Sequence, residues 1–520
     1  MICWRQQAMT CRKYSQYSKT LTVCLVYMLL TFLPVILLFS SGRGEGAVSL
    51  NARRAGLMIN SFVIAFFTVA ICLLIAVFAS LWIYTELNRR SLLRWYFLIL
   101  APVPPYIYAL SYMNLLRFLG RFFPAVLRYR MAGVFPCVVV ETFVYLPFAC
   151  AAALIALDQV NEKEWSAALV LENADKVFIK VIFPKQLPWL LAIGAIIFVL
   201  SITDYSIPSL FQVNVYSMEI FSDYSAAGQS VHSLYLSFPL MLTSSIVIIL
   251  SLLPLRNISF SMKAETGIKP VYSNGLKAAG ITAVFCTLLQ IILPLISFIP
   301  SVQDLGGDLV SASSELWNSC ISGMFAVLIL TVPSAAMALL LSSNDLRLRA
   351  AAWMIAVLPL CIPGVLTGIG VLKLFSSTPL YVLRSGALFP ATGLAIRYLP
   401  FAVLIQYGCY LRIDRDRISA AELLQDRRGK AFMRVQLPLM LPGLVISGIA
   451  VFLLALGDVG TSLVLMMPGR EPMSVKIYNY LHYGSSEKVT AFCLMQMLVI
   501  LVMMGAVCNI SRWFQRKNPT

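Results

Sequence analysis

The sequence predicts an all-α polytopic membrane protein with about 12 transmembrane helices in two parallel repeats of six. Three observations carry this prediction. Of the 520 residues, 59% are hydrophobic and only 12% are charged, with a mean hydropathy of +0.83, and soluble domains do not have such a composition. Apolar windows of about 20 residues, long enough to cross a bilayer, recur along the chain. Short motifs of the first half also return in the second half at a nearly constant spacing.

The expected spans follow from the apolar windows. The first span follows a basic N-terminal segment, and no small-residue cleavage site is convincing between Ser40 and Ala47, so we expect it to stay uncleaved. The twelve windows cover residues 20–40, 57–85, 95–115, 132–157, 189–209, 234–255, 278–300, 317–342, 351–372, 387–410, 442–466 and 489–511.

The distribution of charge predicts the orientation of the spans. With the N-terminus inside, the inner segments hold 27 of the 40 Lys and Arg residues and the outer segments hold 12, while Arg397 lies within a span. Cytoplasmic loops carry such an excess, so both termini are expected in the cytoplasm, with the chain in the cell membrane. The net charge of +17 is therefore a topology signal, and nucleic acid is not an expected partner because no dense, solvated basic face is present.

One segment does not fit this topology. Residues 116–131 should lie outside, yet they contain four arginines, at positions 117, 121, 128 and 130. Their plain interpretation is an interfacial amphipathic helix that faces lipid phosphates. The alternative is an error in the number of spans at this place.

An internal repeat relates the two halves of the chain. Tyr145-Leu-Pro-Phe-Ala149 recurs letter for letter 253 residues later as Tyr398-Leu-Pro-Phe-Ala402. Chance matches do not keep one register over sixty residues, so we expect six spans in the same order in each half. With the join in the polar stretch 256–276, the predicted repeats are residues 1–262 and 263–520. Further residues return at an offset of 254: Phe178, Pro184, Pro188, Phe198 and Asp204 return as Phe432, Pro438, Pro442, Phe452 and Asp458.

The loop between the fourth and fifth spans of each half carries the most information. Asn161 and Asp414 can each cap a helix, with hydrophobic staples at Val160 and Trp165 and at Ile413 and Ile418. A small-residue motif and a second, basic amphipathic segment ending in a proline pair follow in both copies. Such a loop predicts a docking site for a cytosolic partner. Its named residues are Ser166, Ala167, Ala168, Glu172 and Pro184 in the first copy and Ser419, Ala420, Ala421, Gln425 and Pro438 in the second.

At these residues the chain resembles the membrane-spanning subunits of binding-protein-dependent ABC importers in the type I arrangement. The loop of that family reads Glu-Ala-Ala, then a Gly four residues after the second Ala, then an apolar residue two before Leu-Pro. This chain has Ser166 and Ser419 at the Glu position and Glu172 and Gln425 at the Gly position, and its first copy is one residue shorter. The double-length form, with an Asp at 204 and 458, is most similar to the ferric-iron permease group, which includes thiamine and phosphonate relatives.

The resemblance covers nearly the whole chain and implies a function. The loops would sit in clefts of an ATPase dimer in the cytoplasm, and a solute-binding protein would deliver ferric iron or a similar small solute from outside. The chain would then be a transport subunit and not an enzyme, with no cofactor or metal of its own and with ATP used by its partner. No Gly-x-x-x-x-Gly-Lys-Ser/Thr phosphate loop occurs in the sequence, which agrees with this expectation. The departures from the family motif leave open whether both loops couple to the ATPase.

Ionisable residues within the spans are further candidate sites, because charges at membrane depth are costly. Glu141 and Arg397 lie in equivalent spans, and they could form an ion pair between the halves or line the substrate pathway. Asp204 and Asp458 close the fifth and eleventh spans, where they could mark the boundary and cap a turn or shape an outer gate. The outer loops 206–233 and 467–488 are rich in tyrosine, which predicts an interfacial belt and leaves contact with a binding protein possible. His232 and His482 fall in these loops, and we assign no metal to them.

Two other functions remain open from the sequence. An ion-coupled secondary transporter with two parallel six-helix halves is the main alternative. Such carriers need acidic relays inside the bundle, whereas Glu141 is the one central acid of this chain. Their long polar loop joins spans six and seven, whereas the densest inner charge of this chain is at 412–434, between spans ten and eleven. Both observations disfavour the secondary transporter. A membrane enzyme is disfavoured because no loop holds a cluster of His, Asp and Glu.

Overall fold

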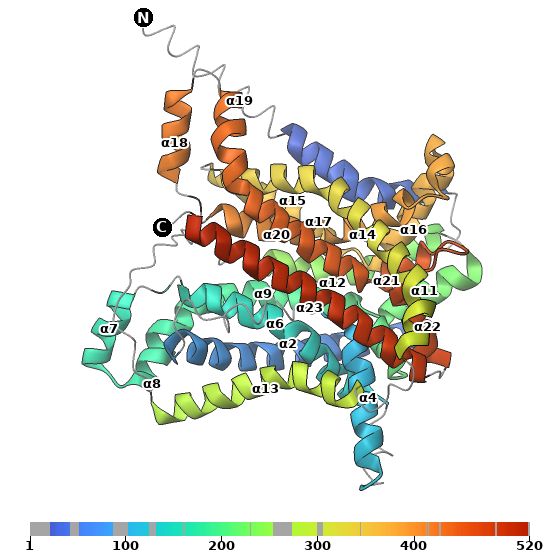
Figure 1. Ribbon diagram of the computed structural model, residues 1–520, viewed down its shortest axis with the longest axis horizontal. Helices are drawn as coiled ribbons and strands as arrows, with labels where there is room; N and C mark the ends of the chain where they lie inside the picture. Colours follow the sequence, from blue (N-terminus) through green and yellow to red (C-terminus); the bar gives the residue numbers. More distant parts are fainter. Residues whose placement is uncertain are drawn as a thin grey trace, which may run out of the picture.

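The described chain is helical throughout, and its long helices run side by side (Figure 1). Among the described residues, ten helices are long and apolar enough to cross a membrane, and a bent helix pair would make an eleventh. This confirms the predicted all-α polytopic fold class. The computed structural model describes residues 21–41, 51–86, 102–123, 132–252, 273–298 and 305–517, apart from breaks at 159, 161, 229, 344, 412, 414, 426–427 and 484–485.

Most of the helices follow the predicted apolar windows. The first window forms the helix Leu21–Phe39. Several helices contain a proline that neighbouring helices accommodate, such as Pro147 and Pro400. The other long helices are α2 (Ala52–Glu86), α6 (Val134–Asp158), α9 (Phe183–Thr203), α12 (Ser230–Leu252), α13 (Asn274–Phe298), α14 (Leu305–Leu341), α17 (Leu388–Tyr410), α20 (Leu437–Leu456) and α23 (Ser486–Lys517).

Two predicted spans differ from straight membrane-crossing helices. The window 351–372 forms α15 (Leu346–Val357) and α16 (Gly364–Ser377), which are bent by 93°. Pro359 and Pro363 lie at the break and have no backbone N–H to continue a helix. The described part of the window 95–115 belongs to α4 (Pro105–Gly120), which begins after Pro102 and Pro104. This helix runs across the direction of α2 and α13 (Figure 1). Residues 95–101 lie outside the described residues.

The N-terminal helix of each sequence half packs on the other half. In the helix Leu21–Phe39, the Tyr27 hydroxyl donates to the carbonyl of Ala356 in α15 at 2.9 Å. A Cβ on Gly370 of α16 would lie 2.8 Å from the Pro34 backbone, so only glycine allows this approach. In the opposite direction, α13 packs on α2 and α4, and Gln290 donates to the carbonyl of Phe143 in α6 at 2.6 Å.

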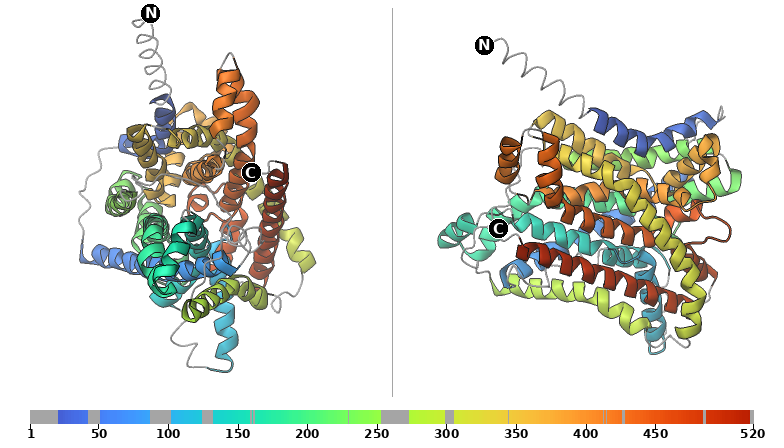
Figure 2. Two further views of the ribbon diagram at one scale, coloured as in Figure 1. Left: turned by 90° about the vertical axis from the view of Figure 1, so that its left-hand side faces the viewer. Right: turned by 45° about the horizontal axis from the view of Figure 1, so that its top comes forward.

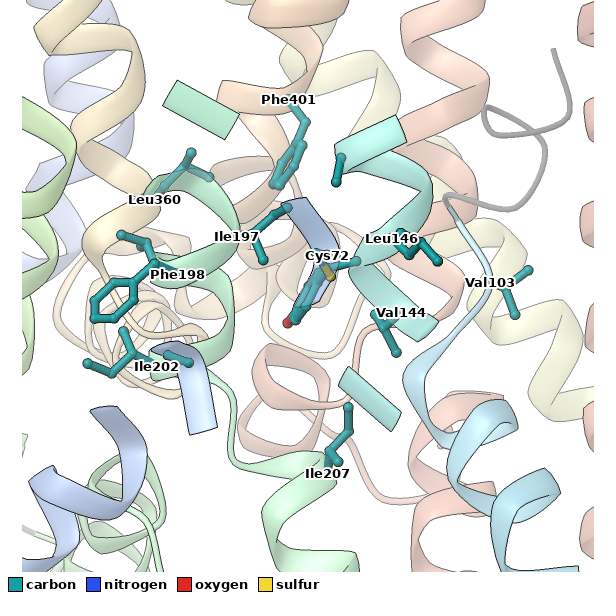
Figure 3. Close-up of a cluster of buried hydrophobic side chains, with 14 of the residues drawn as sticks. Cys72, Val103, Val144, Leu146, Ile197, Phe198, Ile202, Ile207, Leu360 and Phe401 are labelled. Atoms are coloured by element: carbon teal, nitrogen blue, oxygen red, sulfur yellow. The ribbon is translucent and has the colours of Figure 1, made fainter. Parts of the chain in front are cut away.

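The buried core is continuous between the halves. Residues of both halves share it, including Leu146, Ile197, Leu360 and Phe401 (Figure 3). The rings of Phe148 and Phe401 lie 6.4 Å apart. These two residues hold the same place in the repeated Tyr-Leu-Pro-Phe-Ala motif, so equivalent positions of the two halves lie near each other in the core.

Candidate functional site

The two predicted docking loops lie at the same end of the molecule (Figures 1 and 2). In the first loop, α7 (Glu162–Leu171) is followed by α8 (Ala174–Val177), a π-helical turn at Phe178–Ile182 and then α9. In the second loop, α18 (Arg415–Leu424), α19 (Arg428–Ala431) and a π-helical turn at Phe432–Gln436 lead into α20. The predicted caps at Asn161 and Asp414 lie outside the described residues.

The repeated small-residue motif lies on the outward helix of each loop. Ala167, Ser419 and Ala420 are exposed, whereas Ser166 and Ala168 are half-buried. Ala421 is buried, with 9% of its surface exposed. Pro184 and Pro438 are the second residues of α9 and α20, directly after a π-helical turn in each loop.

Each outward helix ends in a pair of large apolar side chains that motif reasoning missed. Val170 and Leu171 at the end of α7 are 85% and 83% exposed, and Leu423 and Leu424 at the end of α18 are 87% and 83% exposed. The pairs are 253 residues apart, the spacing of the Ser-Ala-Ala copies, which was the signal available in the sequence. Large apolar side chains that are exposed together are candidates for contact with a partner.

The π-helical turns occupy the same place in both loops. The backbone N–H of Phe183 donates to the carbonyl of Phe178, and that of Leu437 donates to the carbonyl of Phe432. Each bond spans five residues, and such wide turns inside α-helices are frequent at functional sites. As a result, Ala174–Thr203 and Gly429–Leu456 are each one apolar helix that is continuous from the loop into the bundle.

Charges hold the first loop in a way that the second loop does not repeat. Glu172 forms ion pairs with Lys176 at 3.1 Å and Lys180 at 3.4 Å. Hydrogen bonds from these two lysines lower the pKa of the Glu172 carboxyl. A further ion pair joins Lys185 of α9 to Glu164 of α7. Gln425, the counterpart of Glu172, carries no charge, so the two loops are electrostatically unequal.

Asp204 and Asp458 end the helices that enter from these loops. The Asp204 carboxylate accepts hydrogen bonds from the backbone N–H groups of Ser206 at 3.1 Å and Ile207 at 3.2 Å, at the start of α10 (Ser206–Leu210). The Asp458 carboxylate accepts from those of Thr461 and Ser462, both at 2.9 Å, at α21 (Gly460–Val464). Both aspartates therefore cap a turn, which was one of the two roles expected from the sequence.

A second layer of hydrogen bonds is the same in both halves. The Ser217 hydroxyl of α11 (Tyr216–Ala227) donates to the carbonyl of Asp204, and the Ser474 hydroxyl of α22 (Met473–Tyr483) donates to that of Asp458, each at 2.7 Å. The preceding backbone N–H groups donate to serine hydroxyls, from Tyr216 to Ser61 at 2.9 Å and from Met473 to Ser319 at 2.8 Å. Each turn is thus fixed to α2 or α14.

The two halves touch at these turns. The hydroxyl groups of Ser209 in α10 and Tyr478 in α22 are hydrogen-bonded at 2.7 Å. The ring of Tyr205 lies 6.4 Å from that of Tyr478 in an edge-to-face arrangement. A Cβ on Gly460 would lie 3.6 Å from the Tyr205 ring. The turns after α9 and α20 therefore meet at the end of the molecule opposite to the docking loops.

Glu141 and Arg397 do not form the expected ion pair. Glu141 is fully buried, and its Oε2 accepts hydrogen bonds from Ser201 and, at 3.4 Å, from Thr68. Arg397 instead donates to the carbonyl of Ile362 at the α15–α16 break, at 2.7 Å. The pairing hypothesis was wrong, because each side chain forms its hydrogen bonds with residues of its own half of the sequence. Arg397 also interacts electrostatically with Asp204, so it lies close to one of the capped turns.

These separate partners predict the outcome of a charge exchange. We expect the double variant Glu141→Arg with Arg397→Glu to be no better than either single variant, because each places a buried charge among the wrong partners at a cost of about 3–5 kcal/mol. The measurement is the yield of monodisperse protein by size-exclusion chromatography. Glu141→Gln is the control, since it keeps an acceptor for Ser201 and should lose less. Recovery of the wild-type yield in the double variant would show that residues 141 and 397 do form an ion pair.

The two histidines have ordinary local partners. His232 Nδ1 lies 2.7 Å from Asp223 Oδ2, and the ring of His482 lies 4.5 Å from that of Tyr478. Among the described residues, no group of three or more His, Cys, Asp or Glu side chains could hold a metal ion.

Comparisons with known proteins give this arrangement a family context. No family model matches the chain. A protein of Salmonella choleraesuis named as a 2-aminoethylphosphonate transport system permease, PhnV, is 24% identical over 267 residues, which are 48% of this chain and 100% of the relative. The molybdenum transport system permease ModB of Mycobacterium tuberculosis is 31% identical over 140 residues, 24% of this chain and 52% of the relative.

The chain is a relative of ABC transporter permeases. A molybdenum ABC transporter permease of Haloferax volcanii supports the same assignment, with 26% identity over 224 residues, 41% of this chain and 81% of the relative. The resemblance inferred from the sequence is thereby confirmed at the level of the transporter class. These relatives are transport subunits.

Proposed function

We propose that the chain is the membrane-spanning permease of an ATP-driven importer, built from two repeats at residues 1–262 and 263–520. Each repeat contributes one docking loop, and each loop receives one subunit of an ATPase dimer in the cytoplasm. The exposed pairs Val170–Leu171 and Leu423–Leu424 are the anchors of this contact, since apolar side chains in a partner's cleft dominate binding energy. The permease names of the relatives support the proposal.

The observation that carries the mechanism is the continuity of two helices. Ala174–Thr203 and Gly429–Leu456 each run from a docking loop to a turn capped by aspartate. A helix of about 30 residues is about 45 Å long, so a tilt imposed by ATPase closure at one end displaces the Asp204 or Asp458 turn at the other. The turns meet through Tyr205 and Tyr478. Their separation would open the outer side of the pathway.

The solute is proposed from resemblance. Ferric iron or a similar small solute comes from the sequence motif, while the names of the relatives point to 2-aminoethylphosphonate and to molybdenum. These are the solutes to test first, each with a solute-binding protein that delivers it outside.

Gentle purification of the chain from native membranes tests the proposal. We expect an ATPase subunit to co-purify, and vesicles that contain the complex should take up solute only when ATP is supplied. Uptake driven by a proton gradient without ATP would instead identify an ion-coupled secondary transporter.

A further inference from the structure

A cavity of about 530 Å³ lies near the outer turn of the second half. It is formed where the end of α16, the short helix η6 (Pro379–Leu383) and the start of α17 meet the segment that follows α21. Its size is in the range of sites for small ligands. Arg384, Arg470, Tyr381 and Ser385 provide its polar groups, and Leu372 and Phe389 are among its apolar walls.

The cavity is positively charged. Arg384 and Arg470 both line it, and none of its lining residues is acidic. The Arg384 guanidinium lies 5.9 Å from the centre of the Phe389 ring, which holds this charge at the wall. Guanidinium groups bind phosphate through paired N–H donors, so the cavity is suited to an anion.

The surroundings distinguish a lipid from a free anion. Tyr381 and Val382 of η6 are each 66% exposed, and their neighbours Leu380 and Leu383 are 38% and 42% exposed. This apolar strip adjoins the arginines beside the spanning helix α17. A dissolved anion gains nothing from such a strip, whereas a phospholipid places its phosphate and its acyl chains side by side.

The end of α4 in the first half has a similar composition. At the end of α4, Phe118, Phe122 and Phe123 are 55%, 66% and 62% exposed, and Arg117 and Arg121 are exposed beside them. Both segments carry arginine next to exposed apolar side chains. This is the pattern of protein segments in the headgroup region of a bilayer.

We propose that the cavity binds the phosphate group of an anionic phospholipid. The phosphate lies between Arg384 and Arg470, and the acyl chains lie along η6. The site is separate from the docking loops, and the proposal does not depend on an ATPase partner.

Isothermal titration of the full chain in uncharged detergent tests the site. The probes are dihexanoyl phosphatidylglycerol and inorganic phosphate. We expect saturable binding of the lipid, at least about tenfold weaker in Arg384→Gln and in Arg470→Gln because a charged hydrogen bond is lost. Arg347→Gln, an exposed arginine in the first turn of α15, is the matched control and should bind as the wild type does.

Val382→Asp separates the two sources of the anion. It should weaken lipid binding and leave inorganic phosphate unaffected, and all variants should keep the wild-type thermal midpoint because the altered residues are exposed. Absence of saturable lipid binding, or equal binding by the arginine variants and the control, would overturn the proposal. Inorganic phosphate bound as tightly as the lipid would also overturn it and would assign the cavity to a free anion.

Discussion

The double variant Leu171→Glu with Leu424→Glu is expected to lose the ATPase subunits. Both leucines are more than four-fifths exposed, so the substitutions should not disturb the fold. In the complex, each would place a carboxylate in an apolar cleft, at a cost of about 2–4 kcal/mol per site. Together they should weaken association by about 1,000-fold or more. The measurement is the amount of ATPase that co-purifies per chain, with the uptake rate as a second readout.

The two single variants and two controls make the result specific. Asn173→Glu and Gly429→Glu add the same charge to exposed positions of the same loops, and a Cβ on Gly429 meets no atom within 4 Å. These variants should retain the ATPase. If Leu171→Glu and Leu424→Glu differ in effect, the loops are unequal, as the ion pairs of Glu172 suggest. Full retention by the double variant would contradict the docking role.

Asp458→Ala is expected to destabilise the bundle. Asp458 is buried, and its carboxylate accepts from two backbone N–H groups of α21 and from the Tyr398 hydroxyl at 3.0 Å. Alanine would leave these three donors unpaired, two of them buried, at a total cost of about 3–5 kcal/mol. The measurement is the thermal midpoint of the purified chain, which should fall.

Asp345→Ala is the matched control for this change. Asp345 caps α15 through the N–H of Arg347 at 3.0 Å, but the site is exposed, so its loss should cost about 1 kcal/mol. The thermal midpoint of Asp204→Ala should lie between those of Asp458→Ala and Asp345→Ala, because Asp204 caps α10 in the same way as Asp458 caps α21 but is half-buried. Equal midpoints for Asp458→Ala and Asp345→Ala would show that the capped turn does not stabilise the bundle.

The sequence predicted those parts of the fold that depend on local pattern. Apolar windows locate spans because a bilayer requires about 20 apolar residues. The same windows predicted Asp204 and Asp458 at helix ends, and in the structure these residues cap the turns that follow α9 and α20. Regular helices were predictable because nearly every backbone group in them is paired within the segment.

Other features depend on three-dimensional packing and could not be read from one sequence. The packing of the N-terminal helix of each half on the other half depends on close contacts, such as that of Gly370 with Pro34. The broken helix at Pro363 was hidden inside an apolar window. Glu141 and Arg397 were paired by their similar depth, but the direction of each side chain around its helix decides its partner. The pairs Val170–Leu171 and Leu423–Leu424 have an ordinary helix composition, and only their exposure in the structure distinguishes them.

Native mass spectrometry of the complex released from native membranes tests the central claim most directly. Two docking loops on one chain require two ATPase subunits, so we predict one chain with two copies of an ATPase subunit. A chain that leaves the membrane with no ATPase subunit, under conditions that preserve known complexes of ABC transporters, would contradict the account.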